Sequence, residues 1–178
     1  AIIAASVSFL LLPLNSCEKE LEVTPYSYFT TANFFKTSDE ANMAVLGVYE
    51  AMSSFDSYGW NISILFDTDT DIQQINGLSA DDWRMIPHYQ GISQTNVFYA
   101  VWSKLYEGID RANVAIERIP QMTLYTEGTQ AQKDQLNKFI GEAKFLRGFY
   151  YSELVRLWGD VPFKIKSSQA GDDLKGGL

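Results

Sequence analysis

Four tyrosine and tryptophan residues lie in residues 55–94, a stretch of the sequence without sustained periodicity. They are Tyr58, Trp60, Trp83 and Tyr89, with Asn61, Asp81, Asp82 and Gln90 as polar neighbours. A flat ring can stack on the C–H face of a sugar while nearby amides and carboxylates bind its hydroxyl groups, and loops on a rigid scaffold commonly carry such sites. The alternative is that the rings pack a long loop against the core. We single out Trp60, Asn61, Trp83 and Tyr89 as candidate ligand-binding residues.

The only cysteine, Cys17, follows an uncharged apolar run, AIIAASVSFLLLPLNS. This run is shorter than the ~20 apolar residues that a membrane-spanning helix needs, and it has the length of the apolar part of a signal peptide. The sequence from Leu14 to Cys17 resembles a bacterial lipobox, whose cysteine receives a diacylglyceryl group and becomes the first residue after cleavage. We therefore predict lipidation at Cys17. An ordinary secretory signal or a buried N-terminal helix is the alternative.

The other reactive side chains form no catalytic or metal-binding pattern. Acidic residues alternate from Asp67 to Asp71, but an EF-hand loop needs Gly at its sixth place and Glu at its twelfth, where this chain has Ile72 and Leu78. His88 is the only histidine, and no nucleophile can be paired with it from the sequence. We expect no enzyme activity, no cofactor and no metal site. A hydrolase that uses two carboxylates is a distant alternative.

The composition indicates a globular chain that does not bind nucleic acid. The 178 residues are 46% hydrophobic and 20% charged, which is typical of one folded domain or a piece of one. The formal net charge is -8, whereas phosphate binding requires clustered Lys and Arg side chains. Neutral ligands, cations and basic proteins remain possible partners.

Three helices are predicted from the apolar spacing. A capping box, Thr37 with Glu40, begins a helix over about 38–54. A second helix spans about 96–119 and ends at Pro120, and a third begins after Thr129 and runs to about 158. The apolar stripes that support the first two helices are Ala41, Val45, Val48, Tyr49 and Met52, then Phe98, Val101, Trp102, Leu105, Ile109, Ala112, Ile116 and Ile119.

The third predicted helix is apolar on two faces, which is typical of a helix that lies between neighbours. One face carries Leu136, Phe139, Ile140, Ala143, Leu146, Tyr150, Leu154 and Leu157, and the other carries Gly141, Phe145, Gly148, Ser152 and Val155. Gly141 and Gly148 are seven residues apart and share a face, so we expect another helix to approach closely there. Gly159 and Pro162 indicate where this helix ends.

The residues GEAKFLRG (141–148), Tyr150-Tyr151, Leu154-Val155 and WGDVP (158–162) resemble the signature of the SusD/RagB family. The preceding stretch, with Trp102, Leu105-Tyr106, Ile109, Arg111-Ala112-Asn113 and Ile116, is similar to the family's preceding helix. The lipobox and the series Pro25, Phe34-Phe35, Asp39 and Gly47-Val48-Tyr49 also fit the family's N-terminus. The resemblance covers residues 14–163.

The resemblance implies an all-α fold of tetratricopeptide-like layered helix pairs, here with a long irregular loop region. It also implies an outer-membrane lipoprotein, anchored through lipid on Cys17 and facing the cell exterior. Such a protein binds glycan or another oligomeric nutrient and delivers it to a SusC-type TonB-dependent transporter. The acidic segment 18–22 is similar to the surface-export signal of lipoproteins from Bacteroidota, although it could be only a solvated tether.

We expect four segments. Residues 1–16 are a lipoprotein signal peptide truncated at its start, and residues 17–37 are a lipidated tether and extended lead-in. Residues 38–166 are an incomplete N-terminal helical domain of the SusD type, and residues 167–178 are a tail that departs from the family pattern. The alternative function is a tetratricopeptide-like scaffold that binds a partner protein and no small ligand.

Overall fold

The computed structural model describes residues 34–68, 70–73, 75–76, 82–93 and 95–168. The predicted signal peptide, Cys17 and the tether up to residue 33 lie outside these residues. Every regular element in the described part of the chain is a helix, which confirms the predicted all-α class. Within the described ranges, no helix is both long enough and apolar enough to cross a membrane.

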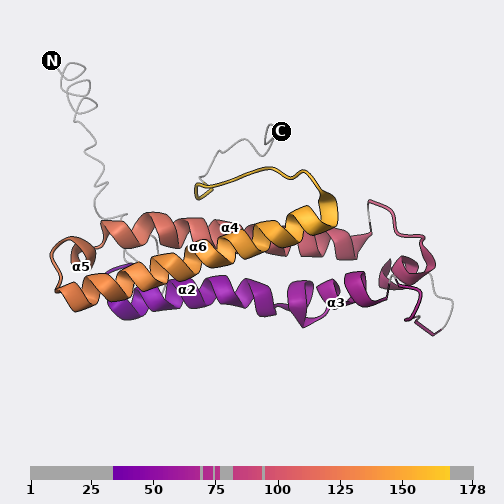
Figure 1. The fold of residues 1–178 in the computed structure, drawn as a ribbon, viewed down its shortest axis with the longest axis horizontal. Coiled ribbons are helices and arrows are strands. Elements are labelled where there is room, and N and C mark those ends of the chain that lie inside the picture. Colours follow the sequence, from indigo (N-terminus) through magenta and orange to yellow (C-terminus); the bar gives the residue numbers. More distant parts are fainter. Residues whose placement is uncertain (1–33, 69, 74, 77–81, 94, 169–178) are drawn as a thin grey trace, which may run out of the picture. The chain divides into compact units, whose positions relative to one another are not determined.

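Three long helices form the body of the fold: α2 (Ser38–Ser53), α4 (Asn96–Arg118) and α6 (Gln130–Trp158). Each packs against the other two. Figure 1 shows that consecutive long helices run in opposite directions, so that α4 returns beside α2 and α6 returns beside α4. The predicted helix boundaries are confirmed closely. The short connection from α4 to α6 is typical of antiparallel neighbours, whereas α2 and α4 are joined by the longer region that contains η2, α3 and η3.

Side chains at the helix ends account for these boundaries. The Thr37 hydroxyl accepts from the Glu40 amide while the Glu40 carboxylate accepts from the Thr37 amide, so the predicted capping box is present. Thr129 and Gln132 form a second capping box at the start of α6. Gly159 ends α6 with a φ of 75°, a backbone angle that favours glycine.

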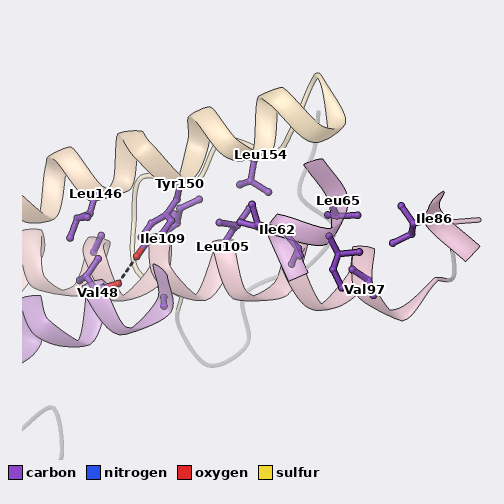
Figure 2. Close-up of a cluster of buried hydrophobic side chains, with 14 residues drawn as sticks. Val48, Ile62, Leu65, Ile86, Val97, Leu105, Ile109, Leu146, Tyr150 and Leu154 are labelled. Atoms are coloured by element: carbon purple, nitrogen blue, oxygen red, sulfur yellow. Dashed lines mark hydrogen bonds between the residues drawn. The ribbon is translucent and has the colours of Figure 1, made fainter. Parts of the chain in front are cut away.

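The core lies along the line where the three long helices meet, and the predicted stripes supply it. Its first cluster, shown in Figure 2, extends from Val48 on α2 through Leu105 and Ile109 on α4 to Tyr150 and Leu154 on α6. The second cluster lies toward the start of α6 and includes Ala41, Val45, Ala115, Ile119, Leu136, Phe139, Ile140 and Ala143. The periodic apolar positions therefore predicted the buried faces of α2 and α4 and the first face of α6.

The region predicted to be irregular, residues 55–94, contains more helix than its sequence indicates. A π-helical turn (η2, Phe55–Gly59) leads into a short helix α3 (Asn61–Asp67), and a 3-10 helix (η3, Asp82–His88) follows. Helix α3 buries Asn61, Ile62, Ile64 and Leu65, which lie on more than one of its faces. A seven-residue helix buried in this way leaves no 3.6-residue pattern, so the sequence could not distinguish it from a loop. The predicted 121–128 connector likewise contains α5 (Thr123–Thr126), which follows a single 3-10 turn, η4 (Ile119–Gln121).

The prediction of a close helix contact at Gly141 and Gly148 is wrong for the described part of the chain. A Cβ atom at either position would meet nothing within 4 Å, and Phe145, between them, is 71% exposed. The close approach occurs instead at Gly108 on α4, where a Cβ would lie 2.6 Å from Cε2 of Tyr150. The second apolar face of α6 is therefore open in the described structure.

Beyond α6 the chain folds back as an extended segment, residues 160–168, which we call the strap (Figure 1). Helix α4 supplies a row of polar side chains that bind the strap backbone. Tyr106 donates to the Pro162 carbonyl at 2.7 Å, and Asn113 donates to the Lys164 and Lys166 carbonyls at 3.3 and 2.9 Å. Because these bonds are made to backbone atoms, they hold the strap without using its side chains.

Candidate functional site

Two of the predicted site residues meet at the end of the fold where η2 joins α3. Trp60 lies 6.4 Å from Trp83, ring centroid to centroid, with the rings at 74°. Phe55 stacks beside Trp60 at 6.1 Å with only 12° between the ring planes. Phe55 is 65% exposed and Trp60 is 46% exposed, whereas Trp83 packs partly into the core. We call Phe55, Trp60 and Trp83 the aromatic platform.

Sequence analysis missed Phe55, because it looked like the residue that merely follows a helix end. Phe55 and Trp60 are five residues apart, which is the spacing of one turn of a π-helix and places both rings on the same side. Gly59 allows this turn, since a Cβ there would lie 2.7 Å from the Ser54 carbonyl oxygen. The five-residue spacing beside a glycine is the only signal in the sequence that could have paired these rings.

Asn61 is placed beside the platform but faces inward. It is 5% exposed, and its side-chain amide donates to Asp56 at 3.1 Å. In this arrangement Asn61 ties the start of α3 to η2, so it positions Trp60 and is not itself presented to solvent.

Tyr89 is exposed but separate from the platform. It is 75% exposed and lies at the end of η3, with its amide bonded to the Ile86 carbonyl at 2.9 Å. Among the described residues, no ring contact connects it with Trp60 or Trp83. Its φ of 56° lies in the left-handed region, which is uncommon for a residue with a side chain and costs roughly 1–2 kcal/mol.

A charged group on α6 contacts the two elements next to the platform, η2 and α3. Glu153 is 5% exposed and forms an ion pair with Arg156, and the Arg156 guanidinium carbon lies 3.8 Å from the centroid of the Phe66 ring on α3. Glu153 and Arg156 are three residues apart, so they are neighbours on the surface of α6. Burial, together with the Glu153 carboxylate, raises the pKa of Tyr58, whose ring packs on Phe149 of α6. This group therefore connects both η2 and α3 to α6.

Charged and polar side chains also link the long helices to one another. Arg111 forms ion pairs with Glu107 on its own helix and with Glu50 on α2, so it links α4 to α2. The Arg111 hydrogen bond lowers the pKa of Glu50. Arg147 donates to the Asn113 side chain at 2.7 Å and does link α6 to α4. Glu142 is exposed on α6.

A cavity of about 520 Å³ lies between α4 and the strap, and sequence analysis did not anticipate it. Three aromatic residues of α4, namely Tyr99, Trp102 and Tyr106, form one wall, and Pro162, Lys164 and Lys166 of the strap form the other. Burial, with a smaller effect from the nearby Tyr151 hydroxyl, raises the pKa of Tyr106 to about 12. The cavity exists only because the strap folds back, and no periodicity in the sequence predicts that path.

No metal-binding cluster is apparent in the part of the chain that the structure describes: no three His, Cys, Asp or Glu side chains there could hold an ion together. Asp67 ends α3, and residue 69 of the alternating acidic stretch lies outside the described ranges. The exposed aromatic surface and the cavity are thus the two features of the described residues that could hold a ligand.

Comparison with known proteins gives consistent matches. A family model described as "Starch-binding associating with outer membrane" matches residues 21–175. Three proteins of Formosa agariphila, each named a SusD-like protein, are 29%, 28% and 27% identical over 94%, 87% and 86% of this chain. The matched regions are 32%, 30% and 29% of those proteins, so the chain spans about a third of their length.

A solved structure matches the fold as well. The crystal structure of a SusD homologue from Bacteroides thetaiotaomicron is 34% identical to this chain, with a TM-score of 0.71. The match covers 78% of this chain and 26% of that one.

Proposed function

Because this chain belongs to the SusD-like family, whose model is described as starch-binding and associated with the outer membrane, we propose that it captures glycan through its aromatic platform. Binding does not require catalysis: the exposed rings of Phe55 and Trp60 stack on apolar sugar faces. The observation that carries the proposal is the stacked, exposed pair of rings held at the end of a rigid helical fold. If these rings only packed the loop against the core, they would be buried.

The rest of the proposal concerns the cellular setting. Lipid on Cys17 anchors the protein in the outer membrane, with the helical domain facing the cell exterior. The bound glycan, or another oligomeric nutrient, passes to a TonB-dependent transporter of the SusC type. These steps are supported by the lipobox-like residues and by the family, whose curated members are about three times as long as this chain.

The test is a panel of neutral oligosaccharides titrated into the full chain, with tryptophan emission as the signal. The chain has four tryptophans, and two of them lie in the platform. We expect at least one oligosaccharide to shift the emission, because stacking removes water from Trp60. A panel without any shift or heat of binding would contradict the proposal.

A second candidate function is a protein-binding scaffold, and the open face of α6 favours it. Phe145 and Val155 on this face are 71% and 54% exposed, and the glycines on either side of Phe145 leave room for a neighbouring helix. A partner helix could pack there through small and large residues that alternate. Loss of partner capture on changing Phe145, with glycan binding intact, would favour this candidate.

A further inference from the structure

The cavity between α4 and the strap offers hydrogen-bond donors, while each of its three carboxylate and amide acceptors has at least one partner in the protein. The Asp110 carboxylate accepts from the Ser168 amide at 2.6 Å, and Glu107 forms ion pairs with Lys104 and Arg111. The Asn113 carbonyl oxygen accepts from Arg147. Each of these three acceptors therefore has a partner within the protein.

Two donors in the same lining, Tyr106 and Asn113, are used by the strap backbone, whereas four others have no partner among the described residues. Lys164 and Lys166 line the cavity and form no ion pair among the described residues, although both are near acidic side chains of α4. The hydroxyl of Ser103 and that of Tyr99, which is 69% exposed, also make no hydrogen bond within the described ranges. A ligand rich in acceptors, and negatively charged, would satisfy these groups.

The aromatic wall of the cavity sets a second requirement for the ligand, which is a flat and partly apolar face. The rings of Trp102 and Tyr106 lie 4.9 Å apart on successive turns of α4, and Tyr99 lies one turn earlier. A row of rings along a helix can accept flat, partly apolar faces, and 520 Å³ is within the usual volume range for small-ligand sites, about 300–1,000 Å³. Sugar rings have such faces, and a carboxylate or sulfate on the sugar would reach the lysines.

We propose that this cavity is a second saccharide site that selects acidic sugars, those that carry carboxylate or sulfate groups. The inference rests on the proposed function only in taking the ligand to be a saccharide; its site is separate from the platform. Selectivity comes from Lys164 and Lys166 locally, because the net charge of the whole chain is -8 and does not attract anions.

Lys164 and Lys166 can be replaced without removing the hydrogen bonds that hold the strap. The hydrogen bonds that hold the strap use its backbone atoms and the Ser167 hydroxyl, so a change of either lysine side chain leaves them in place. The test variant is the double substitution Lys164→Gln with Lys166→Gln. The matched control is Lys138→Gln with Lys144→Gln, which removes the same charge from exposed positions on α6.

The experiment is calorimetric titration of the full chain with trigalacturonic acid and with its fully methyl-esterified form. We expect the acid to bind roughly tenfold tighter than the ester, because two partly exposed ion pairs contribute modestly and additively. The double variant at 164 and 166 should abolish this preference, and the control at 138 and 144 should retain it. A sulfated trisaccharide and its desulfated form, titrated in parallel, distinguish sulfate from carboxylate as the preferred group.

Two outcomes would overturn the inference: equal affinity for charged and uncharged forms, or a preference that survives the change of both strap lysines. The variant Trp60→Ala distinguishes a failure of the cavity proposal from a failure of the platform proposal. Acid-selective binding that persists in Trp60→Ala, without any neutral glycan bound by the parent chain, supports the cavity and contradicts the platform. Neutral glycan binding that depends on Trp60, without acid selectivity, supports the platform and contradicts the cavity.

Discussion

Tyr150 on α6 and Val48 on α2 are joined by a hydrogen bond across 102 residues of sequence, from the tyrosine hydroxyl to the valine backbone carbonyl (Figure 2). Both residues are fully buried. The tyrosine ring packs against Gly108 of α4, so the Tyr150 side chain connects α6 with both of the other long helices. This contact fixes the spacing of the three long helices, of which α4 forms one wall of the cavity.

The first prediction concerns Gly108. A Cβ at this position would lie 2.6 Å from a ring that has no room to move, so we expect Gly108→Ala to destabilise the fold by about 1–3 kcal/mol. Gly148→Ala is the matched control: nothing lies within 4 Å, and alanine should stabilise the helix by about 0.5–1 kcal/mol. Denaturant midpoints measure both. Equal effects of the two substitutions would show that Gly108 is not a close contact.

The second prediction concerns alkaline pH. Burial raises the pKa of Tyr150 from 10.0 to about 12. The neutral tyrosine is therefore favoured in the folded state, and its contribution to stability is complete below pH 10 and lost as the pH rises toward 12. We expect Tyr150→Phe to be less stable at neutral pH by about 1 kcal/mol, through the lost hydrogen bond, but to lose less stability in this alkaline range.

Unfolding curves of both proteins across this pH range test the prediction. Parallel alkaline losses in the parent chain and in Tyr150→Phe would assign the alkaline unfolding to other groups. Tyr106, whose pKa is also raised to about 12 by burial, is the first alternative.

The sequence predicted the parts of the fold that depend on local pattern. The long helices, the capping boxes at Thr37 and Thr129 and the stop at Gly159 follow from spacing and end chemistry, which act over a few residues. The role of Gly108 could not be predicted, because the ring that requires it is on another helix. The glycines at 141 and 148 were wrongly assigned a close contact, since helical spacing shows a shared face but not what covers it.

The candidate site was predictable only in its residue types. Exposed rings in an irregular region indicated Trp60 and Trp83, and the structure places these two together. Phe55 and the strap cavity depend on a π-turn and on a chain reversal, and neither leaves a periodic signal. The inward orientation of Asn61 follows from a hydrogen bond that the sequence does not specify.

The third prediction separates strain from binding at Tyr89. Its left-handed φ suits glycine, so Tyr89→Gly should be more stable than Tyr89→Ala by about 1–2 kcal/mol, although glycine is usually the less stabilising residue. Both variants remove the ring, so if Tyr89 contacts glycan they should weaken binding equally. Thermal unfolding of the two variants measures their stability, and glycan titration measures their binding. An alanine variant as stable as the glycine variant would remove the argument for strain.

The fourth prediction concerns Cys17. With a complete signal peptide in a bacterial host, we expect the mature protein to begin at Cys17, to carry lipid mass and to partition with membranes. Cys17→Ala should abolish the lipid mass, because no other thiol is present in the chain. Intact-mass spectrometry measures the result. An unmodified, soluble product from the parent sequence would contradict the anchored location.

The most direct test of glycan capture is the affinity of the full chain for the best neutral oligosaccharide of the panel, before and after Trp60→Ala. The control is Phe163→Ala, which removes another exposed ring, 74% exposed, from outside both candidate sites. The account predicts a loss of up to roughly tenfold for Trp60→Ala, as expected for one aromatic contact, and no change for the control. Unchanged affinity in Trp60→Ala, with helix content intact, would contradict the claim that the platform binds the glycan.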